Sequence, residues 1–69
     1  MMCLLKVYVE DERTGIRELI ARSVAFISME NGRVRLLDID NEEKIVVNAN
    51  LSFIDALNSI AVLRVHGDS

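Results

Sequence analysis

The only cysteine of this 69-residue chain stands near its start, in the run Met1-Met2-Cys3. Its thiolate would be a soft sulfur donor with its own main-chain nitrogen beside it, so Cys3 could bind a metal ion without a preformed scaffold. A lone cysteine is also often a small apolar filler with no chemical role. The residue type and its position therefore allow two interpretations, a metal ligand or an apolar filler.

Two other groups of side chains could bind a metal ion. His66 is the only histidine, but it begins a polar tail, where a solvated imidazole is the simpler interpretation. Four carboxylates, Asp38, Asp40, Glu42 and Glu43, could attract a hard cation, but they lack the glycine-centred spacing of a calcium loop. We expect a solvated turn there.

Nucleic-acid binding and catalysis have little support in the sequence. Arg22 and Arg33 with Tyr8 could form a small RNA-facing patch, but RNA platforms usually present several stacking aromatics amid basic charge. This chain has one Tyr and a net charge of -3. The sequence also has no nucleophile paired with a histidine, and it has no phosphate-binding glycine loop. We therefore predict that nucleic acid is not a partner and that the chain is not an enzyme.

Size and composition suggest that a second chain covers part of the surface. A chain this short buries only about 60% of its unfolded surface, yet 51% of its residues are apolar. One cysteine cannot close a disulfide within the chain. The expected partner is a second copy, giving a homodimer; the alternative is a monomer whose sheet is apolar on both faces.

The expected location is the cytoplasm. The chain does not begin with a basic segment followed by an apolar run, the pattern of a signal peptide. No apolar stretch approaches the roughly 20 residues that cross a membrane. A single unpaired cysteine fits a reducing compartment.

The hydropathy pattern alternates with a period of two along most of the chain, which predicts strands. A strand is expected over residues 5–10, followed by a turn that ends at Gly15. The segment 16–29 is ambiguous, because its apolar residues would also line one face of a helix. We favour two strands, over residues 17–20 and 24–29, separated by a kink.

The second half of the chain contains the clearest turn signal. Asn31-Gly32 predicts a type I′ hairpin turn before a strand over residues 33–39. Residues 40–43 form a second tight connection, and a strand follows over residues 44–48. Leu51, Ile54 and Leu57 could form one short helical turn before a final strand over residues 59–65.

Together these elements predict an all-β domain. Five or six short antiparallel strands with tight turns would make a small, strongly bent barrel or roll. We expect one domain over residues 1–66 and a polar C-terminal tail over residues 67–69.

The run Met2-Cys3-Leu4-Leu5-Lys6-Val7-Tyr8 resembles the Met-Cys-x-x-Lys-Val-Tyr opening of the CooT-like small nickel-binding proteins. Many members of that family were earlier labelled predicted RNA-binding proteins. Residues 33–39 with 41–43 are similar to the family's hairpin and acidic turn, and residues 54–57 and 60–63 fit its last strand.

The resemblance implies a compact SH3-like β-barrel and a homodimer. It also implies that Cys3 binds nickel(II) near the dimer axis and close to solvent. In that family the protein is linked to supplying nickel to carbon monoxide dehydrogenase, so the resemblance implies a nickel chaperone with this enzyme as its client. The alternative is a small RNA-binding or protein-interaction module without metal.

The chain departs from the family's pattern where two methionines precede Cys3. If translation starts at Met2 and that methionine is removed, Cys3 would carry a free amine. If Met1 is retained, Cys3 offers a thiolate and an amide nitrogen, and the Met1 or Met2 thioether could be a weak extra ligand. Asn41 and Asn48 stand where the family often has Gly, and Asn tolerates left-handed dihedrals.

Overall fold

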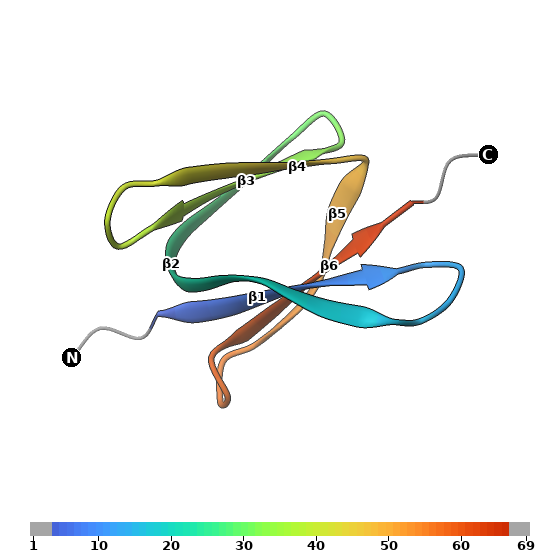
Figure 1. Ribbon diagram of the computed structural model, residues 1–69, viewed down its shortest axis with the longest axis horizontal. Coiled ribbons are helices and arrows are strands. Elements are labelled where there is room, and N and C mark those ends of the chain that lie inside the picture. The colour runs from blue at the N-terminus through green and yellow to red at the C-terminus, as the bar shows by residue number, and fades with distance from the viewer. Residues whose placement is uncertain (1–3, 67–69) are drawn as a thin grey trace.

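The computed structural model describes residues 4–66, and within this range the chain is all strand and turn (Figure 1). The six strands are β1 (Leu5–Asp11), β2 (Arg17–Glu30), β3 (Arg33–Asp38), β4 (Glu43–Val47), β5 (Ala49–Asp55) and β6 (Ile60–Val65). Among these residues there is no helix long and apolar enough to cross a membrane.

All six strands belong to one sheet, in the order β4-β3-β2-β1-β6-β5. The sheet curls until β5 approaches β3, and the Ala49 main-chain nitrogen donates a hydrogen bond to the Gly32 carbonyl oxygen at 3.0 Å. This closure confirms the predicted all-β class and small barrel-like form.

Strand β1 lies inside the sheet, with β2 antiparallel on one side and β6 parallel on the other. In Figure 1 the arrows of β1 and β6 point the same way. The prediction of antiparallel strands is wrong for this one pair. The alternation of apolar residues is the same in parallel and antiparallel strands, so the pattern alone does not reveal the direction.

Strand β2 is one continuous element of 14 residues that pairs with two neighbouring strands. Its first half pairs with β1 and its second half pairs with β3, and Val24 has a partner in both. Ser23 has a φ of 56° at the change of partner, and the register shifts on either side of it. The helical alternative is therefore wrong, and the predicted kink is a bend within a single strand.

The tight turns follow the local chemistry of their residues. Asn31 and Gly32 have φ values of 45° and 78°, as a type I′ turn requires. Gly15, Asn41 and Asn48 also have positive φ, at 76°, 65° and 55°. Both positions at which Asn stands for the family's Gly thus adopt the left-handed conformation, as expected.

The predicted helical turn at Leu51, Ile54 and Leu57 is wrong. Residues 49–55 form β5, and the register with β6 shifts between Leu51 and Phe53. One extra residue in β5 at this shift moves the side chains that follow to the opposite face of the sheet. The apolar residues of β5 are therefore spaced three apart, as they would be in a helix.

The interior of the barrel is aliphatic. It contains Val7, Val24, Val34, Leu36, Ala49, Ala61 and Leu63, all fully buried. Leu5 and Val9 of β1 pack against this cluster together with partly buried residues of the other strands.

A second apolar cluster lies on the outer face of the sheet. Val62 is 1% exposed but is not part of the interior cluster. Its neighbours across the strands are Tyr8 and Phe53, and the guanidinium of Arg17 lies 5.5 Å from the centre of the Phe53 ring. The cation–π contact and the two rings shield Val62 without a second layer of structure.

Glu10 forms ion pairs with two arginines at the edge of this cluster. Arg17 Nε donates to Glu10 Oε1 at 2.7 Å, and Arg64 Nη2 lies 3.7 Å from Glu10 Oε2. The hydrogen bond from Arg17 is the main cause that lowers the pKa of Glu10 below its ordinary value of 4.5.

Replacing Leu36 by Ala should lower the free energy of unfolding by about 2–5 kcal/mol, because the change leaves a cavity in the interior. Leu36 is 1% exposed. Urea denaturation followed by circular dichroism measures the loss. The matched control is Ile16→Ala, since Ile16 is 67% exposed; its loss should be below about 0.5 kcal/mol. Equal losses would contradict the assignment of the interior.

Acid should remove the contribution of Glu10 to stability. Because its pKa is lower in the folded state, the contribution is present above pH 4.5 and is lost as the pH falls through the lowered value. Between pH 6 and pH 3, the free energy of unfolding should therefore fall less in Glu10→Gln than in the unchanged chain. The difference between the two should correspond to the protonation of one carboxylate. Arg17→Met, which removes the donor, should flatten the same curve. Urea denaturation across this pH range tests both; two unchanged curves would refute the ion pair's role.

Candidate functional site

The predicted metal ligands Cys3 and Met2 lie outside the described residues. The structure does describe the point at which the chain enters the fold after them. Leu5 of β1 pairs with Val24 of β2, and the Lys6 main-chain nitrogen donates to the Ser59 carbonyl oxygen at 2.9 Å. Strand β1 is therefore held from both sides within three residues of Cys3.

The β5–β6 turn flanks this end of β1 on one side. Asp55 Oδ2 accepts a hydrogen bond from Asn58 Nδ2 at 2.8 Å, and Asp55 Oδ1 accepts one from the Asn58 main-chain nitrogen at 3.2 Å. These bonds, the side-chain bond first, lower the pKa of the Asp55 carboxyl. At the tip of this turn Leu57 is 92% exposed.

Sequence reasoning missed the exposure of Leu57 because it assigned the residue to a helical turn. The usable signal was the pair Asp55 and Asn58, since Asp at the start of a turn commonly accepts hydrogen bonds from residues further along it.

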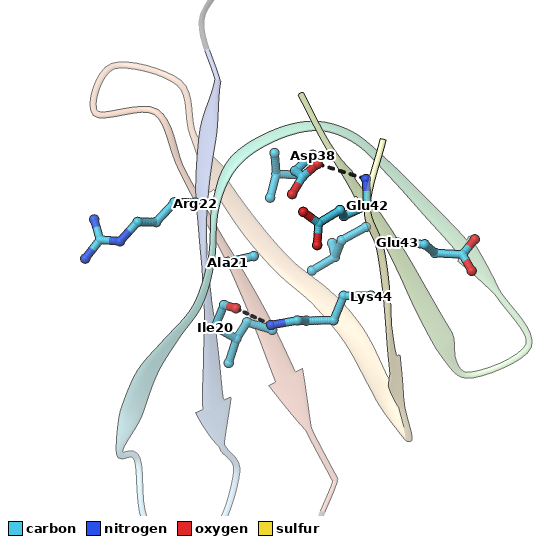
Figure 2. A pocket seen from close by; sticks show the side chains of 9 residues that line it. Ile20, Ala21, Arg22, Asp38, Glu42, Glu43 and Lys44 are labelled. Atoms are coloured by element: carbon cyan, nitrogen blue, oxygen red, sulfur yellow. Dashed lines mark hydrogen bonds between the residues drawn. The ribbon is translucent and has the colours of Figure 1, made fainter. Parts of the chain in front are cut away.

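A cavity of about 250 Å³ lies on the other side, between the bend of β2 and the start of β4 (Figure 2). Val24 and Leu36 contribute apolar walls. Lys44 Nζ donates to the Ile20 carbonyl oxygen at 2.6 Å and links β4 to the bend of β2. In Figure 2 the side chain of Arg22 points away from the other labelled residues.

Three of the four predicted acidic residues come together at the β3–β4 turn, and two of them, Asp38 and Glu42, also line this cavity. Carboxylate oxygens of Asp38, Asp40 and Glu42 lie within 4.8 Å of one another. Asp38 Oδ1 accepts hydrogen bonds from the main-chain nitrogens of Asp40 and Glu42, at 2.8 and 2.9 Å.

The arrangement of these carboxylates has a structural explanation, because Asp38 caps the β3–β4 turn. Glu43, the fourth acidic residue, instead pairs with Arg35 across β3 and β4. The ligands offered here are hard oxygens, which suit magnesium, calcium or manganese, whereas a cysteine thiolate suits softer ions. The cluster is thus different in kind from the predicted thiolate site.

His66 is better anchored than a solvated tail residue would be. Its Nδ1 lies 2.9 Å from Glu12 Oε1, and its Nε2 lies 2.7 Å from Asn50 Nδ2. An amide nitrogen donates, so Nε2 accepts and the ring proton sits on Nδ1, facing Glu12. The side chain is about half exposed, and it joins the end of β6 to the β1–β2 turn and to β5.

The structure does not bring together the residues of the alternative RNA-facing patch. Tyr8 is half-buried in the outer cluster beside Val62. Arg22 lies at the bend of β2, and Arg33 lies at the β2–β3 hairpin opposite Glu30. Arg22 follows Ala21, the partner of Val7, and is therefore a near neighbour of Tyr8, whereas Arg33 lies away from both at the hairpin that ends β2.

Comparison with known proteins finds a match to a family model described as the CO dehydrogenase accessory protein CooT. The match covers residues 2–64 and thus includes both Met2 and Cys3. No curated protein matches the sequence. The family description names an accessory protein of CO dehydrogenase and not an enzyme, in agreement with the expectation from the sequence. With nearly its whole length matched, this chain belongs to the CooT family of CO dehydrogenase accessory proteins.

Proposed function

We propose that this protein binds nickel(II) through the thiolate of Cys3 and delivers the ion to a nickel enzyme, with CO dehydrogenase as the client. The observation that carries the proposal is the family match, because it pairs an accessory role for CO dehydrogenase with a segment that includes the chain's only cysteine.

The donor chemistry supports nickel as the cargo. Nickel(II) accepts nitrogen and sulfur ligands and favours square-planar or tetragonal geometry. Cys3 supplies one sulfur and its own main-chain nitrogen. Two chains would supply two of each, which completes a four-coordinate site shared across a homodimer, and the Met2 thioether is a weak additional donor.

The fold suits a site that must release its ion. Strand β1 is fixed from Leu5 onward by β2 and from Lys6 onward by β6. Cys3 is therefore within three residues of the point where β1 is held by both neighbouring strands. A ligand near solvent exchanges its ion more readily than a ligand enclosed in a core, and ready exchange favours delivery over storage.

The proposal includes a homodimer in the cytoplasm, with residues 1–66 as one domain and 67–69 as a polar tail. Support for the dimer comes from the half-exposed apolar side chains of this small barrel, among them Phe26, Ile39, Ile45 and Val47. Reducing conditions would keep the single thiol free for metal binding.

Cys3→Ser should abolish nickel binding, because the hydroxyl is a much poorer ligand than a thiolate. Nickel titration of the reduced protein, followed by ultraviolet absorption and native mass spectrometry, should give a thiolate-to-nickel charge-transfer band and one ion per two chains. Both signals should vanish in the variant. The matched control is the double variant Asp40→Asn with Glu42→Gln, which should bind nickel normally. Nickel affinity that survives Cys3→Ser and falls in the control would place the ion at the carboxylates and refute the proposal.

Nickel affinity should also fall as the pH is lowered, because a thiol must lose its proton to bind. An ordinary cysteine has a pKa of about 8.5, so nickel binding near neutral pH should release close to one proton per thiol. The main-chain nitrogen should release a further proton, because an amide, or an amine that is mostly protonated at this pH, must also lose one to bind. Calorimetric titrations in buffers of different ionisation enthalpy count those protons. Binding without proton release would mean that the sulfur is not the ligand.

A further inference from the structure

Basic side chains gather on the outer face of the sheet around β1, although the chain as a whole has a net charge of -3. Glu10 of β1 stands opposite Arg17 of β2 on one side and opposite Arg64 of β6 on the other. Lys6 lies on the same face, because alternate residues of a strand point to the same side. We call this surface the arginine face. It consists of Lys6, Tyr8, Arg17, Phe53, Val62 and Arg64.

Within residues 4–66, the two guanidinium groups of this face keep most of their donors unpaired. Each guanidinium has five N–H donors. Arg17 Nε donates to Glu10 Oε1 at 2.7 Å, whereas Arg64 Nη2 lies 3.7 Å from Glu10 Oε2, beyond hydrogen-bond distance. The two arginine side chains are 52% and 49% exposed, and Glu10 is 18% exposed. Glu10 therefore positions both arginines and leaves them able to bind further carboxylates.

An apolar row crosses the middle of the arginine face. Tyr8, Val62 and Phe53 stand opposite one another on β1, β6 and β5. Val62 is fully buried, but the Phe53 ring is 42% exposed. Lys6 precedes Tyr8 by two residues and Glu10 follows it by two. The apolar row thus lies between Lys6 on one side and Glu10 with its two arginines on the other.

This spacing matches every second residue of an extended chain. Two residues of a β-strand span about 6.6 Å, so each group of cations lies about that far from the apolar row along β1. In an extended segment laid over the face, alternate side chains point to the same side with the same spacing. A carboxylate, an apolar side chain and a second carboxylate at alternate positions would therefore meet Lys6, the apolar row and the arginines in that order.

Carboxylates limit the length of the arginine face at both ends. Asp11 and Glu12 follow β1 in the turn to β2, and Asp55 stands opposite Ile60 where β5 ends. Charges screen each other beyond about 10 Å at moderate salt, so a short acidic segment feels mainly the cations beneath it. A long polyanion such as a nucleic acid would also run over the acidic turns, which repel it.

The aromatic rings of the face also favour a protein segment over a nucleic acid. The guanidinium of Arg17 lies 5.5 Å from the centre of the Phe53 ring, and Tyr8 is half-buried beside Val62. Binding of single-stranded nucleic acid usually relies on aromatic rings on which bases can stack. Here one ring already carries a cation and the other is packed into the sheet surface.

We propose that the arginine face binds an extended acidic segment of a partner protein, in which carboxylates flank an apolar side chain. The carboxylates pair with Lys6 at one end and with Arg17 and Arg64 at the other. The apolar side chain packs on Phe53 beside Val62. This inference goes beyond the proposed function, since it requires neither nickel nor its ligands.

Fluorescence anisotropy with the reduced, nickel-free protein tests the proposal. The probe is a short labelled peptide with glutamate, leucine and glutamate at alternate positions, and the reference peptide has glutamine in place of both glutamates. The acidic peptide should bind at least about tenfold more tightly, because two charged pairs each contribute up to about fivefold. Its affinity should fall as salt is added.

Arg64→Gln and Lys6→Gln should each weaken binding of the acidic peptide by about fivefold, since each removes one of the pairs. Both side chains are exposed, so thermal unfolding by circular dichroism should stay unchanged. The matched control is Arg33→Gln, because Arg33 is exposed but lies at the β2–β3 hairpin opposite Glu30. This control should bind the peptide as the unchanged chain does.

Several results would overturn the proposed binding surface. These are no measurable binding of the acidic peptide, equal affinity for the two peptides, or the same loss in Arg33→Gln as in Arg64→Gln. A labelled oligouridylate of matched length that binds more tightly than the acidic peptide, and that Arg64→Gln weakens, would assign the face to nucleic acid instead. Cys3→Ser should bind the acidic peptide normally, so the nickel proposal and this one can fail separately.

Discussion

The pairing of β1 on both sides is the constraint on which the rest of the structure depends. A strand with two neighbours cannot shift along one of them without breaking its register with the other, so β2 and β6 together fix where β1 begins. The residues that precede Leu5 are thus attached to a point that the sheet holds rigid.

Closure of the sheet around this central strand requires sharp changes of chain direction. These occur at residues with short polar side chains and a positive φ. Ser23 adopts a left-handed conformation where β2 passes from β1 to β3, and Asn48 does so between β4 and β5. These bends allow six short strands to enclose an aliphatic interior. They leave the charged groups on turns and outer faces, where Arg17 pairs with Glu10 and Asp38 caps a turn.

Much of the fold could be predicted from the sequence, because turns are decided by local chemistry. Asn31-Gly32 specified its hairpin, and Asn41 behaved as its tolerance for positive φ implied. The parallel pairing of β6 with β1 could not be predicted, since it depends on contacts between distant residues. The register shift after Leu51 made a strand look helical. Cys3 and Met2 are proposed as ligands from the sequence alone, as residues of a recognisable opening, whereas the exposed tip at Leu57 became visible only in the structure.

The chain offers two kinds of side chain to a metal ion: the thiol of Cys3, ahead of β1, and a group of carboxylates at the β3–β4 turn. The central claim is that nickel belongs to the first of these. X-ray absorption spectroscopy at the nickel edge, on the full chain loaded with one ion per dimer, tests this claim most directly. The predicted result is sulfur bonded to nickel together with nitrogen in a four-coordinate arrangement. A nickel ion surrounded by oxygen alone in a six-coordinate arrangement would contradict the account.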